Sequence, residues 1–204
     1  MALRAVVFDV GETLVDEERW WRELCKRGGL QPHVVWAALG VTIERGEEHD
    51  ALWEHLAIER PDTPWADLMY EHADLYPDAI ACLEAVRDLG LSVGIAGNQT
   101  EALEAWARDE GLPADVVASS ASLGVRKPDP MFFAKVCELV GQSPGDVAYV
   151  GDRVDNDVLP AAAAGLIAVH VRRGPWGRLQ ATPPEAALSL DDLASLPQAL
   201  ASLA

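Results

Sequence analysis

Four separated segments of this sequence carry side chains that could perform chemistry together. Asp9 follows a short apolar run and opens a turn, and Gly97-Asn98 ends a second such run. Asp152 and Asp157 follow a third run, while Lys127 lies in an extended segment just before a helix-like stretch. Taken singly, such residues also cap helices, form turns or extend into solvent. Together, carboxylates from two strand ends and one ammonium group are what a Mg²⁺-assisted attack on a phosphate requires.

The charges of these side chains suit that reaction. A carboxylate that approaches a phosphate dianion meets like-charge repulsion, so cations must neutralise both groups. Mg²⁺ prefers oxygen ligands and uses one or two carboxylates together with the substrate phosphate. Asp9 and Asp152 can supply those carboxylates, and Lys127 can place a point charge on the phosphoryl oxygens.

Short apolar runs and helical stretches alternate along most of the chain. The runs predict buried parallel strands at residues 5–8, 91–96, near 116–117, 147–150 and 167–171. Helices are predicted between them, at residues 78–89, 100–110, 128–140 and 155–164, with a last strand and helix within 188–203. This alternation predicts an α/β fold with a doubly wound parallel sheet, whose ligands bind beyond the carboxyl ends of the strands. Asp9, Gly97 and Asp152 all fall at such ends.

Residues 16–76 differ from the rest of the chain. They contain no strand-like run, and they carry five of the seven tryptophans. Helix candidates lie at residues 17–27, 32–39, 44–60 and 64–75. We therefore expect an inserted helical cap at 16–76 over a core domain of residues 1–15 and 77–204. Trp20 and Trp21 are adjacent on a helix and cannot both face one small core, so one of them is a candidate to line a pocket.

These motifs resemble those of the haloacid dehalogenase-like (HAD) hydrolase superfamily. The resemblance covers residues 5 to about 177, and its specific parts are Gly-Val-Arg-Lys-Pro-Asp-Pro (124–130) and Gly-Asp-Arg-x-x-Asn-Asp (151–157). It implies a Rossmann-like sheet with a helical cap inserted after the first strand, and Mg²⁺ as cofactor. By this resemblance, Asp9 would be the nucleophile that forms an aspartyl-phosphate. The implied metal ligands and phosphate-binding groups are Asp9, the Gly11 carbonyl, Asp152 with Asp157 supporting the metal shell, and Lys127, which would pair with Asp9 and the phosphate.

Two positions depart from the pattern of that superfamily. Its phosphatases usually carry a second aspartate, as general acid and base, at the position of Gly11. Loss of such help slows turnover by about 10²–10⁴-fold, and Glu12 or Asp16 are the candidates to replace it. The second position is Gly97, where the superfamily usually has Ser or Thr. A backbone N–H of Gly97 or Asn98 would then bind the phosphate in its place.

Three functions follow from these residues. The leading one is a Mg²⁺-dependent phosphatase that acts on a small phosphomonoester. The alternative is a catalytically weak or inactive HAD-scaffold protein with a binding or regulatory role, which Gly11 and Gly97 favour. A metal-independent 2-haloacid dehalogenase is the third, because such enzymes also lack the second aspartate, but the presence of Asp152 and Asp157 weighs against it.

Composition limits the partners of the protein. The 204 residues carry a formal net charge of −17, which argues against binding to nucleic acid or anionic membranes. An anionic substrate therefore needs a local positive site. No apolar run is long enough for a membrane span, and the scattered Cys25, Cys82 and Cys137 indicate reduced thiols in a cytoplasmic protein. We expect a monomer or homodimer.

Two further segments receive structural interpretations. Arg153 follows Asp152 directly, and we expect it to form a structural salt bridge. Residues 173–177 match neither a GxGxxG nor a GxxxxGK loop and are predicted to form an ordinary loop after the last core strand.

Overall fold

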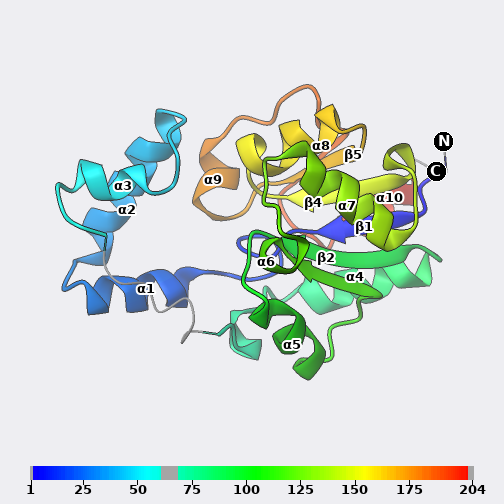
Figure 1. Ribbon diagram of the computed structural model, residues 1–204, viewed down its shortest axis with the longest axis horizontal. Coiled ribbons are helices and arrows are strands. Elements are labelled where there is room, and N and C mark those ends of the chain that lie inside the picture. Colours follow the sequence, from blue (N-terminus) through cyan, green and yellow to red (C-terminus); the bar gives the residue numbers. More distant parts are fainter. Residues whose placement is uncertain (1, 61–68, 202–204) are drawn as a thin grey trace.

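A single parallel sheet forms the centre of the molecule. The computed structural model describes residues 2–60 and 69–201. Within these residues, six parallel strands form a sheet of order β3-β2-β1-β4-β5-β6. The strands are β1 (Ala5–Phe8), β2 (Ser92–Gly97), β3 (Val116–Ser119), β4 (Val147–Gly151), β5 (Ile167–Val171) and β6 (Leu188–Leu190). The predicted α/β, Rossmann-like parallel sheet is confirmed (Figure 1).

Both faces of the sheet are covered by helices, which explains why its strands are mostly apolar. In β1, Val6 and Phe8 pack into the cluster on one face, while Ala5 and Val7 pack into the cluster on the other. The first cluster includes residues of α4 (Ala79–Asp88), α5 (Ala102–Asp109) and α10 (Leu196–Ala201). The second includes residues of α7 (Pro130–Val140) and α8 (Leu159–Ala163). These helices therefore fix the sheet from both sides.

The carboxyl ends of three neighbouring strands meet at one edge of the sheet. β1 lies between β2 and β4, and Phe8 is in register with Ile95 on one side and Val150 on the other. Because all three strands run in the same direction, the residues that follow them emerge together. The chain passes from β1 to β2 and β3 on one side, and the connection after β3 then crosses to β4 on the other side of β1. Parallel sheets open a binding crevice where the strand order reverses in this way.

Three helices after β1 form a separate layer beside the sheet. They are α1 (Glu18–Arg27), α2 (Pro32–Glu44) and α3 (Ala51–His55), and they share an apolar cluster that includes Trp21, Leu39 and Trp53. The sheet domain contributes Trp176 to this cluster, from α9 (Gly174–Leu179). Figure 1 shows α9 between the sheet and the pair α2–α3. That residues 16–76 form a cap domain of their own remains a prediction.

Some predicted helices differ in the structure. The single helix predicted at 44–60 is wrong, because α2 continues to Glu44, Gly46 adopts a φ of +63° and only α3 follows. The helix predicted at 64–75 lies partly outside the described residues, and the described part holds only the short 3₁₀ helix η1 (His72–Asp74). The helix predicted at 155–164 begins instead with the π-helical turn η3 (Val154–Val158).

The segment after β5 also departs from its prediction. Residues 173–177 do not form an ordinary loop, because α9 starts at Gly174 and has Pro175 in its first turn. Proline has no N–H to leave unsatisfied there and its fixed φ suits a helix start. The buried Trp176 then anchors α9 among the apolar side chains of α1–α3.

Short elements complete the described chain. They are α6 (Ser120–Leu123) after β3 and the 3₁₀ helix η2 (Pro144–Asp146) before β4. The three cysteines are buried and none forms a disulfide. Among the described helices, none combines the length and apolar character needed to cross a membrane.

Candidate active site

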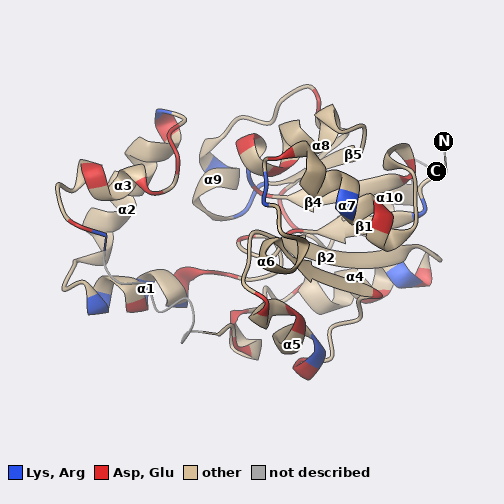
Figure 2. Ribbon diagram, viewed as in Figure 1, with Lys and Arg blue, Asp and Glu red and all other residues tan. Residues whose placement is uncertain are grey.

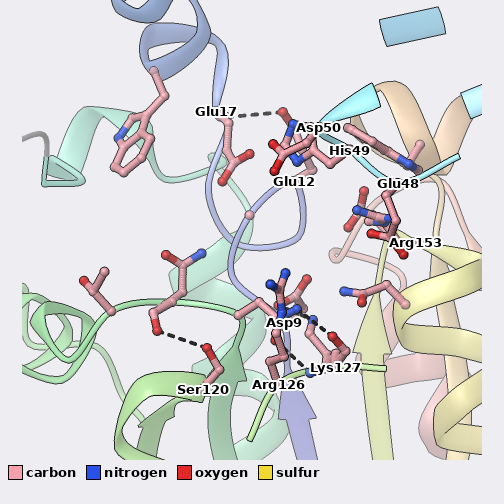
Figure 3. Close-up of a pocket in the computed structure, with 18 of the residues that line it drawn as sticks. Asp9, Glu12, Glu17, Glu48, His49, Asp50, Ser120, Arg126, Lys127 and Arg153 are labelled. Carbon is pink, nitrogen blue, oxygen red and sulfur yellow. Dashed lines mark hydrogen bonds and ion pairs between the residues drawn. The ribbon is translucent and has the colours of Figure 1, made fainter. Parts of the chain in front are cut away.

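Lys127 lies at the centre of the site, where it joins two of the strand-end carboxylates. Its side chain is only 1% exposed. The Nζ atom lies 2.7 Å from Asp9 Oδ1 and 2.6 Å from Asp157 Oδ1. Figure 3 shows Asp9 and Lys127 side by side at the floor of a pocket. Three segments that are far apart in the sequence are thus brought into direct contact.

The backbone of Lys127 is held by Asn98. Its N–H donates a hydrogen bond to Asn98 Oδ1 (2.8 Å), and Asn98 Nδ2 donates one to the Lys127 carbonyl (3.0 Å). Lys127 Nζ also lies 5.5 Å from the centre of the Tyr149 ring. The Asn98 side-chain amide, just after β2, therefore positions Lys127. That the backbone N–H of Asn98 binds a phosphate remains a prediction.

Asp157 is fully satisfied by the protein, whereas the Asp152 carboxylate is not. Asp157 Oδ1 accepts from Lys127 and Oδ2 accepts from the Arg153 N–H (3.0 Å). His170 Nε2 donates to the Asp152 carbonyl at 3.0 Å, which fixes the backbone there. The Asp152 carboxylate itself, in a residue 3% exposed, has no hydrogen bond or ion pair from any part of the chain that the structure describes. A buried carboxylate without a partner is costly, so this group fits a cation.

The geometry of the acidic cluster fits the same conclusion. One carboxylate oxygen from each of Asp9, Asp152 and Asp157 lies within 4.8 Å of the others. Burial raises the pKa of Asp9 to about 6, although Lys127 lowers it. Burial, followed by the charges of Asp157 and Asp9, raises the pKa of Asp152 well above its usual range. Burial would lower the pKa of Lys127, but Asp157 and Asp9 outweigh it and raise this pKa. Three carboxylates share one ammonium group, and an oxygen-seeking divalent cation would balance them.

Gly97 gives Asp9 room for its present position. A Cβ atom at Gly97 would lie 2.5 Å from Asp9 Oδ1, closer than any real contact. A Ser or Thr at this position would therefore require the Asp9 side chain to shift from its present position.

The two expected substitutes for the acid missing at Gly11 differ in position. Glu12 is 7% exposed, and its Oε2 accepts a hydrogen bond from the Tyr76 hydroxyl at 2.7 Å. Burial raises the pKa of Glu12 to about 7, despite the Tyr76 bond. Asp16 accepts from the Glu18 N–H (2.8 Å) and is not among the described residues that line the pocket.

Another acidic residue, Glu17, also lines the pocket, although no sequence motif identifies it. Its Oε1 accepts a hydrogen bond from the Tyr70 hydroxyl at 3.0 Å, and its carboxyl group lies against Gly11. Burial, followed by the like charge of Glu12, raises the pKa of Glu17 to about 8. The only signal in the sequence was an acidic residue at the start of a helix, which is common at helix N-termini.

The pocket is a cavity of about 860 Å³ between the sheet edge and the helices α1–α3. Asp9, Lys127 and Asp152 line it from the sheet. Both Trp20 and Trp21 line it as well, but they pack differently. Trp21 belongs to the apolar cluster of α1–α3, whereas Trp20 packs against the sheet cluster, as their adjacency requires.

Arg153 closes one side of the pocket. It pairs with the Asp155 carboxylate, so the predicted structural salt bridge is confirmed. Its guanidinium also lies 4.7 Å from the centre of the Trp176 ring. Arg153 and Trp176 both line the cavity, which places α9 at the site.

Comparisons with known proteins agree on a family. A family model described as haloacid dehalogenase-like hydrolase matches residues 3–165. A glyceraldehyde 3-phosphate phosphatase of Methanopyrus kandleri is 28% identical over 190 residues, which cover 86% of this chain and 75% of that protein. A phosphoglycolate phosphatase of Chromobacterium violaceum is 28% identical over 218 residues, 95% of each chain.

A solved structure has a similar fold. The crystal structure of an L-2-haloacid dehalogenase superposes with a TM-score of 0.73 at 22% identity, over 98% of this chain and 100% of the other. Phosphatases and a dehalogenase are thus among the similar proteins, so the side chains at the site must discriminate between these activities.

Proposed function

This chain belongs to the haloacid dehalogenase-like hydrolases, and we propose that it is a Mg²⁺-dependent phosphatase that hydrolyses a small phosphomonoester through an aspartyl-phosphate on Asp9. The observation that carries the proposal is the buried Asp152 carboxylate, which has no partner among the described residues and lies beside the Asp9–Lys127 pair. The phosphatase relatives support the same reaction class.

Each residue of the site has a role in this reaction. Asp9 would attack phosphorus, and Lys127 would neutralise charge on Asp9 and on the phosphoryl oxygens. Gly97 and Asn98 would offer backbone N–H groups to those oxygens. Asp9, Asp152 and the Gly11 carbonyl would hold Mg²⁺, with Asp157 supporting this shell through its bonds to Lys127 and the Arg153 backbone. When bound, the ion supplies charge neutralisation between the nucleophile and the phosphate.

The acidic cluster supports a phosphatase over a metal-independent dehalogenase. Without a cation, burial and like-charge repulsion make the ionised Asp152 costly. A reaction without a metal leaves the cost of ionising Asp152 uncompensated, whereas metal-assisted phosphoryl transfer uses the same carboxylate as a metal ligand.

The cavity supports a small substrate. Its volume of about 860 Å³ lies within the range of small-molecule sites, and aromatic rings of Trp20, Trp21 and Trp176 form part of its wall. The relatives act, by their names, on glyceraldehyde 3-phosphate and phosphoglycolate, which are small phosphomonoesters. The absence of nucleic-acid and membrane partners, a cytoplasmic location and a monomeric or homodimeric state remain predictions.

A phosphatase assay tests the proposal. The purified protein, given 4-nitrophenyl phosphate and a panel of phosphorylated metabolites, should release phosphate with Mg²⁺ and lose this activity in EDTA. Asp9→Asn should abolish turnover, since it removes the attacking carboxylate. Equal trace turnover by wild type and Asp9→Asn would contradict the proposal. Release of halide from a 2-haloacid in EDTA would favour the dehalogenase instead.

A further inference from the structure

The space above Gly11 is filled by a carboxyl group from another segment. A Cβ atom built on Gly11 would overlap Glu17 Oε1 and would lie 2.8 Å from Cδ and 3.4 Å from Oε2. The Glu17 carboxyl therefore occupies the volume into which a side chain at position 11 would extend. Gly11 and Asp9 are two residues apart in one turn, and both line the cavity together with Glu17.

Glu17 is oriented by groups on other elements. The Tyr70 hydroxyl donates to Glu17 Oε1 (3.0 Å), and Gln99 Nε2 donates in turn to the Tyr70 oxygen (3.0 Å). Within residues 2–60 and 69–201, Glu17 has no ion pair with a basic side chain, and its Oε2 accepts no hydrogen bond. Figure 3 shows the Glu17 side chain directed down into the pocket above Asp9. One oxygen is thus anchored and the other is left for a ligand.

The other acidic groups beside the Asp9 turn are less suited to contact a substrate. Glu12 uses Oε2 for the Tyr76 hydroxyl, and its Oε1 accepts a long bond of 3.4 Å from the Glu17 N–H. Its side chain also packs where a Cβ at Gly174 would lie. Asp16 does not reach the described lining of the cavity.

We propose that Glu17 is the general acid and base of the reaction, in place of the side chain that Gly11 lacks. This inference rests on the proposed function. Alkyl phosphates need such a group, because an alkoxide leaves poorly unless its oxygen is protonated as the bond breaks. Glu17 is the acidic residue whose carboxyl group adjoins the Asp9 turn, faces the cavity and has an oxygen to spare.

The proton balances over the two steps. In the first, an Asp9 oxygen forms a bond to phosphorus, the bond from phosphorus to the leaving oxygen breaks, and the Glu17 carboxyl gives its proton to that oxygen. The alcohol leaves, and Glu17 is now a carboxylate. In the second, water attacks the phosphorus of the aspartyl-phosphate and passes a proton to Glu17. The bond from phosphorus to Asp9 breaks, which returns the Asp9 carboxylate and inorganic phosphate.

Two substrates with different leaving groups test the acid role and the base role of Glu17 separately. With phosphoglycolate, Glu17→Gln should lower kcat by about 10²–10⁴-fold, because both steps lose their proton transfer. With 4-nitrophenyl phosphate, whose leaving group needs no proton, the first step should survive and the second should not. The variant should then release a burst of nitrophenolate equal to the enzyme present, followed by slow turnover and an acid-trappable phosphoryl adduct on Asp9. Glu18→Gln, an exposed neighbour, is the matched control and should behave as wild type in both assays.

A swap of positions gives an independent readout. Gly11→Asp alone should be impaired, since its side chain collides with Glu17. Glu17→Ala should lose alkyl-phosphate activity, and the double variant Gly11→Asp/Glu17→Ala should regain at least about tenfold of it. This gain would show that an acidic group in the volume that Glu17 fills serves the reaction, which together with the burst of Glu17→Gln assigns the role to Glu17.

The outcomes distinguish the inference from the proposed function. If wild type hydrolyses neither substrate through Asp9, both are overturned. If hydrolysis depends on Asp9 but Glu17→Gln slows both substrates equally without a burst, and the double variant is no faster than Glu17→Ala, only the role of Glu17 is overturned. A burst confined to the aryl substrate, with recovery in the double variant, supports it.

Discussion

At the scale of single residues, the site has an excess of buried negative charge around Lys127. The ammonium group contacts Asp9 and Asp157, and the nearby Asp152 has no cation of its own among the described residues. Buried ion pairs add little net stability, yet removal of one partner is costly because the other charge stays buried. Lys127 and Asp152 therefore have opposite effects on stability, which two substitutions can measure.

Lys127→Met should destabilise the protein by about 3–5 kcal/mol in EDTA at pH 7, because Asp9 and Asp157 lose their shared cation. Urea unfolding followed by circular dichroism gives this free energy. Lys26→Met, at a side chain that is 79% exposed, is the control and should change stability by less than about 1 kcal/mol. An equal effect of the two substitutions would show that the central ion pair does not matter to the fold.

Asp152→Asn should have the opposite effect on the free energy of unfolding and stabilise the protein. In EDTA the variant should unfold at a higher temperature than wild type, because a buried charge that Asp157 and Asp9 repel is removed. Mg²⁺ should raise the stability of wild type, by about 2.7 kcal/mol at a hundredfold excess over Kd, and should leave the variant unchanged. Asp191→Asn, at an exposed carboxylate, should retain the response to Mg²⁺. A Mg²⁺ response in Asp152→Asn as large as that of wild type would remove Asp152 from the metal site.

At the scale of elements, α9 links the sheet to the inserted helices. Trp176 of α9 packs in the apolar cluster of α1–α3, and its ring lies 5.0 Å from that of His49, which precedes α3. His49 in turn lies 5.1 Å from the ring of Trp21 on α1. His49 thus lies between one ring from each layer, and it is a titratable member of this contact.

This contact predicts a pH-dependent stability. Burial lowers the pKa of His49 from its usual 6.5 to about 4, and Arg153 also lowers it, while Asp50 opposes this and Arg60 and Arg126 add to it. Between pH 4 and 6.5, the His49 ring binds a proton in the unfolded chain but not in the native protein. Stability is therefore complete above about pH 6.5 and falls as the pH drops to 4, by about 3 kcal/mol.

His49→Phe keeps the rings in contact and removes the proton. The free energy of unfolding of wild type, minus that of the variant, should decrease as the pH falls from 6.5 to 4 and level off below. Chemical denaturation at a series of pH values measures it. If this difference in the free energy of unfolding does not change with pH, His49 has an ordinary pKa in the folded protein and the prediction is wrong.

At the scale of the whole molecule, the protein is strongly acidic, and four of its basic side chains line the cavity. The formal net charge is −17, and acidic positions lie on the helices and loops around the sheet as well as on α1–α3 (Figure 2). The lining of the cavity includes the basic residues Arg60, Arg126, Lys127 and Arg153 among a larger number of acidic ones. Low-dielectric walls focus such charges, so these cations, together with a bound divalent ion, would offset the acidic groups toward an anionic phosphomonoester, whereas the net charge repels polyanions.

The sequence alone determined the sheet and the main carboxylates of the site. Apolar runs that end at Asp9, Gly97 and Asp152 identify parallel strands, because a strand buried on both faces has to be apolar throughout. Parallel strands that neighbour each other deliver their ends to one edge, so Asp9 and Asp152 meet because β1 and β4 pair in the sheet. Lys127 could be assigned from the order and spacing of its motif.

Only the tertiary structure decided what fills the gaps around those residues. Glu17 lies over Gly11, and Trp176 joins the helices α1–α3, through contacts that no local periodicity encodes. The sequence showed that Gly11 lacks a side chain, but which group takes the vacated volume depends on the path of the chain between β1 and α1. Packing between distant segments sets that path, and for this reason the acidic group next to the nucleophile became visible only in three dimensions.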